Sequence, residues 1–188
     1  MILIRSVKVV DGSGSPAYSA DVLVQGERIV NVGNFPSAKA EMIIDGLGCY
    51  LTPGLIDIHT DIDHSLSLLT EPQQSHFLEQ GVTTIIGGNC GSSLAPLLYG
   101  TLESIQKWAD INRVNVNWQT LREFLDLLQR RGIGVNFGTL VGHATVRRAL
   151  LGEQLRDLTE KEMAVFGAVL SQALREGAFG LSTGLSYA

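Results

Sequence analysis

The chain has 188 residues, of which 45% are hydrophobic, and its formal net charge is −5. This composition supports a buried core and excludes a largely disordered chain. The 14 lysines and arginines are scattered, which argues against a nucleic-acid-binding surface. No apolar run is long enough to cross a membrane, and the first residues reach charge and glycine too early for a signal peptide. We therefore expect a cytoplasmic protein that binds neither nucleic acid nor membranes.

Short strands separated by turns are predicted for the first fifty or so residues. Aliphatic and β-branched residues dominate segments 2–10, 20–33 and 40–51, and glycine, serine and proline interrupt them. None of these segments has the apolar spacing of a convincing helix. Residues 1–51 are therefore expected to form part of a small β-sandwich.

From residue 52 onward, strands and helices are predicted to alternate. Strands are expected near residues 55, 83, 135 and 180, and helices over 71–80, 117–132 and 158–177. Thr159 with Glu162 predicts a capping box at the start of the last helix, and Gly132 predicts the end of the helix before it. Such alternation is typical of parallel strands joined by helical crossovers.

Candidate functional residues follow the predicted strands of this second region. In parallel α/β folds, functional groups gather at the carboxyl ends of the strands. His59 and Asp61 follow the first strand and are two residues apart, so on an extended strand they would point to the same side. One divalent ion could bind both side chains. A polar strand end that meets solvent is the alternative interpretation.

Cys90, His143 and Tyr187 follow the later strands. Cys90 lies between glycines in "GGNCG" and is either a zinc ligand or a small buried side chain. His143 either lines the site or makes a structural hydrogen bond. Tyr187 either polarises a substrate carbonyl or packs in a loop.

Several motifs, taken in chain order, resemble the amidohydrolase superfamily and, within it, the N-acyl-D-amino-acid deacylases (D-aminoacylases). The similar segments are "VVDGSGSPAYSADVLVQGERIVNVG", "PGLIDIHTDID", "GVTTIIGGNCG", "LVGHATVRRALLG" and "GAFGLSTGLSYA". The resemblance implies a small β-sandwich joined to a (β/α)8 barrel that binds zinc at its mouth. It also implies hydrolysis of an N-acyl-D-amino acid to the D-amino acid and a carboxylate.

The resemblance also implies roles for individual residues. Cys90 corresponds to the ligand of the tightly held zinc, and His59 to the first histidine of a pair at the other metal position. Tyr187 corresponds to a tyrosine that helps to polarise the substrate carbonyl. The resemblance assigns no role to His143, which we expect to contact substrate because it follows the third predicted strand. Asp61 stands where the family usually has histidine, so the second metal position should be altered, although a carboxylate can still bind zinc.

The length of the chain limits what the resemblance can cover. A complete (β/α)8 barrel takes about 250 residues, so residues 52–188 are expected to hold only about the first four β/α units. The family's remaining zinc histidines and general-base aspartate belong to later strands. We therefore expect the chain to be inactive alone and to self-associate or pair with a complementary C-terminal half. The alternatives are a cyclic amidase of the dihydroorotase or hydantoinase type and a non-catalytic half-barrel that persists as an assembly.

Overall fold

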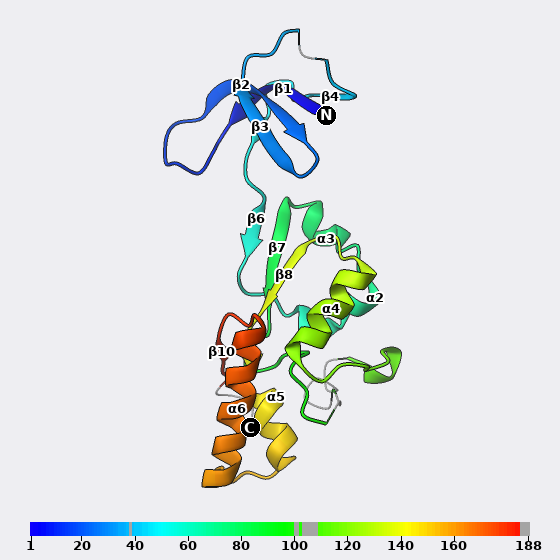
Figure 1. The fold of residues 1–188 in the computed structure, drawn as a ribbon, viewed down its shortest axis with the longest axis vertical. Coiled ribbons are helices and arrows are strands. Elements are labelled where there is room, and N and C mark those ends of the chain that lie inside the picture. The colour runs from blue at the N-terminus through cyan, green and yellow to red at the C-terminus, as the bar shows by residue number, and fades with distance from the viewer. Residues whose placement is uncertain (38, 100–101, 103–108, 185–188) are drawn as a thin grey trace. The chain divides into compact units, whose positions relative to one another are not determined.

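The computed structural model describes residues 1–37, 39–99, 102 and 109–184 of the chain. It divides into two compact units, Met1–Gly54 and Leu55–Ala188, which differ in secondary structure. The first unit consists of strands and the second combines strands with helices, so the chain has a mixed α/β fold (Figure 1). No described helix is long and apolar enough to cross a bilayer.

The first unit is a twisted sheet in which β1 pairs with three other strands. Its strands are β1 (Ile2–Val9), β2 (Tyr18–Gln25), β3 (Arg28–Gly33), β4 (Met42–Asp45) and β5 (Tyr50–Leu51). The strand order is β3-β2-β1-β4, and β5 also pairs with β1. The β1–β2 and β2–β3 pairs are antiparallel, whereas β4 and β5 run parallel to β1. The predicted series of short strands is confirmed.

The core of this first unit is small. Val7, Val9 and Val22 are buried together between β1 and β2. Aliphatic side chains of the outer strands remain exposed on the unit, namely Ile29, Val30, Val32, Met42, Ile43 and Ile44. The sheet therefore buries apolar surface mainly along its central pair of strands.

The second unit contains two parallel sheets. One has the order β6-β7-β8, formed by β6 (Leu55–Asp57), β7 (Val82–Gly87) and β8 (Asn136–Thr139). The other pairs β9 (Val141–Gly142) with β10 (Leu181–Ser182). The predicted parallel pairing is confirmed. The described strands do not close into a barrel.

The described helical segments of the second unit are α1 (Ile62–Ser65), α2 (Ser67–Thr70), α3 (Ser75–Leu78), η2 (Ile111–Arg113), α4 (Leu121–Arg131), α5 (His143–Leu151) and α6 (Glu160–Glu176). The first four of these segments are only three or four residues long. The prediction of one helix over 71–80 was wrong in extent, because Gln74 has a left-handed φ of 49° that no continuing helix allows. Helix α5 was not predicted.

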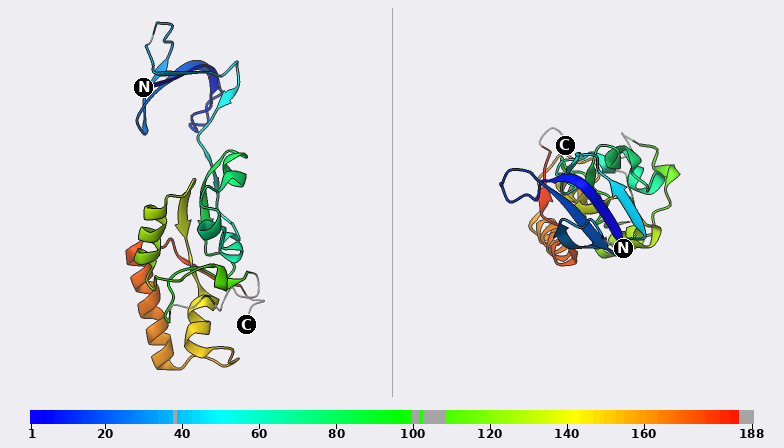
Figure 2. Two further views of the ribbon diagram at one scale, coloured as in Figure 1. Left: turned by 90° about the vertical axis from the view of Figure 1, so that its right-hand side faces the viewer. Right: turned by 90° about the horizontal axis from the view of Figure 1, so that it is seen from above.

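The two long helices have the ends that the sequence predicts. Thr159 and Glu162 form a capping box at the start of α6, and Gly132 ends α4. A second capping box, between Thr120 and Glu123, begins α4 four residues later than expected. The start of α4 lies next to the end of α6 (Figures 1 and 2), and the two are linked by a 3.0 Å hydrogen bond from Arg122 N to Glu176 Oε2.

The core of the second unit lies between the β6–β7–β8 sheet and its helices. Ile85 of β7 and Leu121 and Phe124 of α4 are fully or almost fully buried in it. Trp118 packs against Phe124, and its Nε1 donates a 2.7 Å hydrogen bond to Leu94 O. This contact fixes the segment after β7 to the start of α4, so the loop that carries Cys90 has a rigid base.

Candidate metal centre

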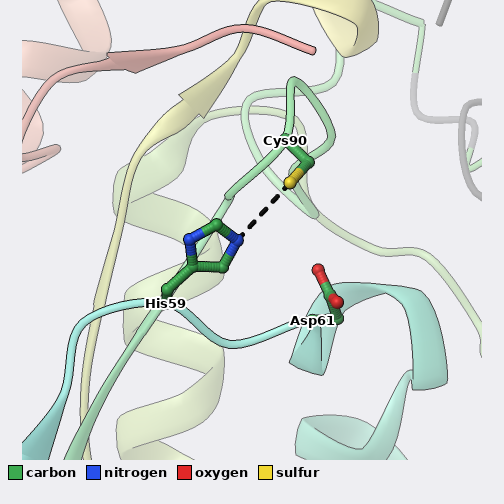
Figure 3. Close-up of side chains that lie close together, drawn as sticks. All are labelled: His59, Asp61 and Cys90. Carbon is green, nitrogen blue, oxygen red and sulfur yellow. Dashed lines mark hydrogen bonds between the residues drawn. The ribbon is translucent and has the colours of Figure 1, made fainter. Parts of the chain in front are cut away.

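Three side chains that can bind a metal meet at the carboxyl ends of β6 and β7. His59 and Asp61 follow β6, and Cys90 follows β7. One potential ligand atom from each lies within 4.8 Å of the others. The His59 Nε2 and Cys90 Sγ atoms point toward one another at 3.4 Å, with the Asp61 carboxylate beside them (Figure 3).

The backbone positions His59 and Asp61 in this cluster in a different way from the one predicted. Strand β6 ends at Asp57, so neither residue lies on an extended strand. The His59 N–H donates a 3.1 Å hydrogen bond to Asp57 Oδ1, which turns the chain at the strand end. Asp61 is the N-cap residue of α1, with φ −94° and ψ 33°. We predicted that His59 and Asp61 come together because they point to the same side of an extended strand. That reason was wrong, because the chain turns between the two residues.

One backbone carbonyl ties the His59–Asp61 segment to the end of β7. Ile86 O accepts hydrogen bonds from Thr60 N at 3.2 Å, from Thr60 Oγ1 at 2.8 Å and from Asn89 Nδ2 at 2.8 Å. Asn89 Nδ2 also lies 3.3 Å from Thr60 O. Both segments that carry candidate ligands are thus fixed to the same peptide group.

Cys90 is presented by a turn of unusual backbone conformation. Its φ is 54°, in the left-handed region that residues with a side chain rarely adopt. Ser182 of β10 holds this turn at two points. Its Oγ accepts a 3.0 Å hydrogen bond from Gly91 N and donates a short one to Gly88 O. Such local strain is common at functional sites, where surrounding contacts impose it.

Asp63 is a buried carboxylate directly behind this turn. Its side chain is 1% exposed, and Oδ2 accepts a 2.5 Å hydrogen bond from Gly88 N. Burial raises the pKa of the Asp63 carboxyl to about 6, while the Gly88 N–H opposes that rise. The sequence does not single out this residue. Nothing in the "DIDH" pattern separates Asp63 from its neighbours, because its burial depends on β7 folding over it.

His64 is a further histidine near the cluster, and only 12% of its side chain is exposed. Its Nδ1 lies 3.6 Å from Asp61 Oδ1. A protonated His64 would stabilise the Asp61 carboxylate, whereas a metal ion at Asp61 would compete with it for the same oxygen. The helical spacing of residues 61 and 64 was the signal that could have suggested this pair.

Among the described residues, His143 is not part of the cluster of His59, Asp61 and Cys90. His143 is the first residue of α5, and its ring packs 5.5 Å, centroid to centroid, from that of Phe166. Burial, with a smaller contribution from Arg147, lowers the pKa of His143. Its substrate contact therefore stays a prediction. Tyr187 lies outside the described residues.

The donor set of the cluster fits a divalent metal such as zinc. Imidazole, thiolate and carboxylate are all zinc ligands, with bond lengths of about 2.0–2.3 Å. In a tetrahedral site these bond lengths put neighbouring ligand atoms about 3.6 Å apart. The His59–Cys90 distance of 3.4 Å agrees with that value. The Asp61 carboxylate lies within 4.8 Å of both other ligand atoms, on a side chain that is 63% exposed.

Comparisons with known proteins find relatives that match nearly the whole of this chain. The sequence is 39% identical over 187 residues to an N-acyl-D-aspartate deacylase of Alcaligenes xylosoxydans xylosoxydans, covering 98% of this chain and 36% of that protein. It is 34% identical to a D-aminoacylase of the same organism, covering 99% of this chain and 38% of the relative. No family model matches the sequence.

A solved structure gives the same result. The fold matches that of the N-acyl-D-glutamate deacylase of Bordetella bronchiseptica, solved with zinc and a phosphonate inhibitor. The TM-score is 0.88 at 30% identity, over 99% of this chain and 38% of that one. The chain thus spans little more than a third of the length of the proteins it matches. It is a homologue of the N-terminal portion of the N-acyl-D-amino-acid deacylases, in the amidohydrolase superfamily.

Proposed function

We propose that the chain belongs to a zinc-dependent enzyme that hydrolyses the amide bond of N-acyl-D-amino acids. The products would be the free D-amino acid and a carboxylate. The observation that carries the proposal is the convergence of His59, Asp61 and Cys90 within 4.8 Å. The similarity to a deacylase that was solved with zinc and a phosphonate mimic of a tetrahedral intermediate supports it.

In this proposal His59, Asp61 and Cys90 hold zinc at the mouth of a partial (β/α)8 barrel. Zinc bound there supplies Lewis acidity for amide hydrolysis. Cys90 and Asp61 contribute negative charge, and His59 completes the set as a neutral imidazole. Tyr187 is proposed to polarise the substrate carbonyl and His143 to contact substrate.

Turnover is proposed to need more than these residues. The relatives are nearly three times as long as this chain, so most of their residues have no counterpart in it. We therefore expect the 188 residues alone to bind metal without hydrolysing substrate.

The test is a hydrolysis assay with zinc present, run on the product of the full open reading frame and on the 188-residue chain in parallel. The substrates are N-acetyl-D-aspartate, N-acetyl-D-glutamate, their L enantiomers and a cyclic imide. We expect the full product to release acetate from the D enantiomers only. Hydrolysis of the cyclic imide without any release of acetate would contradict the proposal and favour the cyclic amidase.

A further inference from the structure

Asp63 makes a single strong contact, and that contact is with the turn that presents Cys90. Oδ2 of the buried carboxylate accepts the Gly88 N–H at 2.5 Å. Oδ1 has no hydrogen-bond partner among the described residues, and the backbone of Leu94 makes a smaller contribution that lowers the carboxyl's pKa. Burying a carboxylate with so few hydrogen-bond partners costs free energy, so another effect of its position must offset that cost.

The backbone around Gly88 is shaped to admit this carboxylate. A Cβ at Gly87 would lie 2.8 Å from Asp63 Oδ2, and one at Gly88 would lie 2.1 Å from Leu140 O. Gly88 has a φ of 74°, and Cys90, two residues on, has a φ of 54°. Asp63 therefore forms a hydrogen bond with the first residue of a turn in which both Gly88 and Cys90 have left-handed backbone conformations.

We propose that Asp63 is a positioning residue of the metal centre, whose carboxylate holds the Gly88 N–H and so keeps Cys90 Sγ beside His59 Nε2. Two other side chains, Ser182 and Asn89, also form hydrogen bonds with the backbone at this turn. Ser182 holds Gly91 N and Gly88 O, and Asn89 holds Ile86 O. Without Asp63 the Gly88 N–H would lose its acceptor, and the turn would be free to swing the thiol away from the imidazole.

This inference rests on the proposed metal site, but one part of it can be tested without metal. The wild-type chain, Asp63→Ala and Asp63→Asn are compared by amide hydrogen exchange at Gly88. Asparagine keeps an acceptor oxygen of similar reach, and alanine removes it. Gln74→Ala is the matched control, because Gln74 is equally buried and donates to Ser67 O at 2.9 Å and Glu71 O at 2.6 Å without contacting the turn.

The expected result is a loss of Gly88 protection by roughly tenfold or more in Asp63→Ala and not in Gln74→Ala. Asp63→Asn should retain most of the protection. Wild-type protection in Asp63→Ala would overturn the proposal. Should Asp63→Ala fail to fold, NMR of the wild-type chain decides. A scalar coupling between Gly88 N and Asp63 Cγ supports the contact, and its absence overturns it.

Binding of cadmium alone then tests the effect on the thiol, with the sulfur-to-metal absorption band reporting coordination by Cys90. We expect Asp63→Ala to weaken binding by about 10- to 100-fold, as for other groups that orient metal ligands. Gln74→Ala should bind within about threefold of wild type, even if it melts at a lower temperature. Wild-type affinity in a folded Asp63→Ala variant would overturn the positioning role. If the wild-type chain binds no cadmium, the proposed metal site fails, and Gly88 exchange alone decides whether Asp63 holds the turn.

Discussion

Asp61 is the residue at which this chain departs from the histidine usual in the family it resembles. Its side chain is 63% exposed, and its Oδ1 lies 3.6 Å from His64 Nδ1. A carboxylate brings negative charge to the site, whereas a histidine would bring a neutral nitrogen ligand. The charge of any metal bound here should therefore be more fully neutralised than with two histidines.

We predict that Asp61→Ala weakens zinc binding by about tenfold or more, because losing a ligand should cost at least as much as losing a group that orients one. Competition with a chromophoric chelator measures the affinity. Asp157→Ala is the control, since Asp157 is also an exposed acidic residue of the second unit. Equal affinities for the Asp61→Ala and Asp157→Ala variants would show that Asp61 does not bind the metal.

At this scale the sequence predicted that His59, Asp61 and Cys90 lie at strand ends, and the structure brings them together, but the sequence did not predict how the chain positions them. His59 and Cys90 were found because glycine and strand patterns mark the ends of β6 and β7. Asp63 was missed because its burial is set by the packing of Gly87 and Gly88, residues more than twenty positions away. Tertiary contacts of this kind leave no local pattern in one sequence.

Helix ends were the best predicted feature at the scale of elements, because a capping box is a local interaction. Thr159 and Glu162 satisfy each other's backbone N–H groups, and Glu162 also pairs with Arg156 at 2.6 Å. Helix α5, by contrast, has no capping side chain and was missed. The prediction of a helix over 71–80 was wrong in extent because Gln74, which is buried, has a left-handed backbone conformation.

The capping interaction predicts a pH dependence of stability. Arg156, followed by Thr159, lowers the pKa of Glu162 to about 2 from its usual 4.5. A lowered pKa in the folded state stabilises the protein above pH 4.5, and this stabilisation is lost as pH falls toward 2. Glu162→Gln should therefore flatten the fall in urea midpoint across this range. Glu160→Gln, in the same helical turn, should leave the slope unchanged, and equal slopes for both variants would contradict the prediction.

The turn before Cys90 predicts a difference between two glycines of similar conformation. Gly81 and Gly88 have φ values of 80° and 74°, but a Cβ at Gly81 meets nothing within 4 Å. Gly81→Ala should cost about 1–2 kcal/mol for the left-handed backbone. Gly88→Ala should cost about 1–3 kcal/mol more, because its Cβ would overlap Leu140 O. Chemical denaturation measures both, and equal losses would show that the close approach is absent in solution.

Exposed apolar surface is the main feature at the scale of the whole molecule. In the first unit, β3 and β4 stand at opposite ends of the strand order, and each exposes aliphatic side chains. In the second, Leu55, Ile56 and Ile58, in and just after β6, are each more than half exposed. The aliphatic and β-branched segments of the sequence predicted these strands. They did not predict what covers the strands, because a segment's composition shows that it is apolar and not which surface packs against it.

We predict that the purified chain self-associates at micromolar concentration, since large exposed apolar patches favour association. Sedimentation equilibrium over a range of concentrations measures it. Ile43→Lys and Ile56→Lys should each shift the distribution toward monomer. Glu27→Lys, at an exposed position that is already polar, serves as the control. A stable monomer across the whole range would contradict the prediction.

The metal content of the purified chain tests the central claim most directly. Wild type, Cys90→Ala and Cys49→Ala are loaded with zinc, dialysed and analysed by mass spectrometry of the metal. Cys49 is the other free cysteine and lies in the first unit, which makes its variant the matched control. We predict stoichiometric zinc in wild type and Cys49→Ala, and loss of zinc in Cys90→Ala. Zinc retained by Cys90→Ala, or absent from all three proteins, would contradict a metal centre at His59, Asp61 and Cys90.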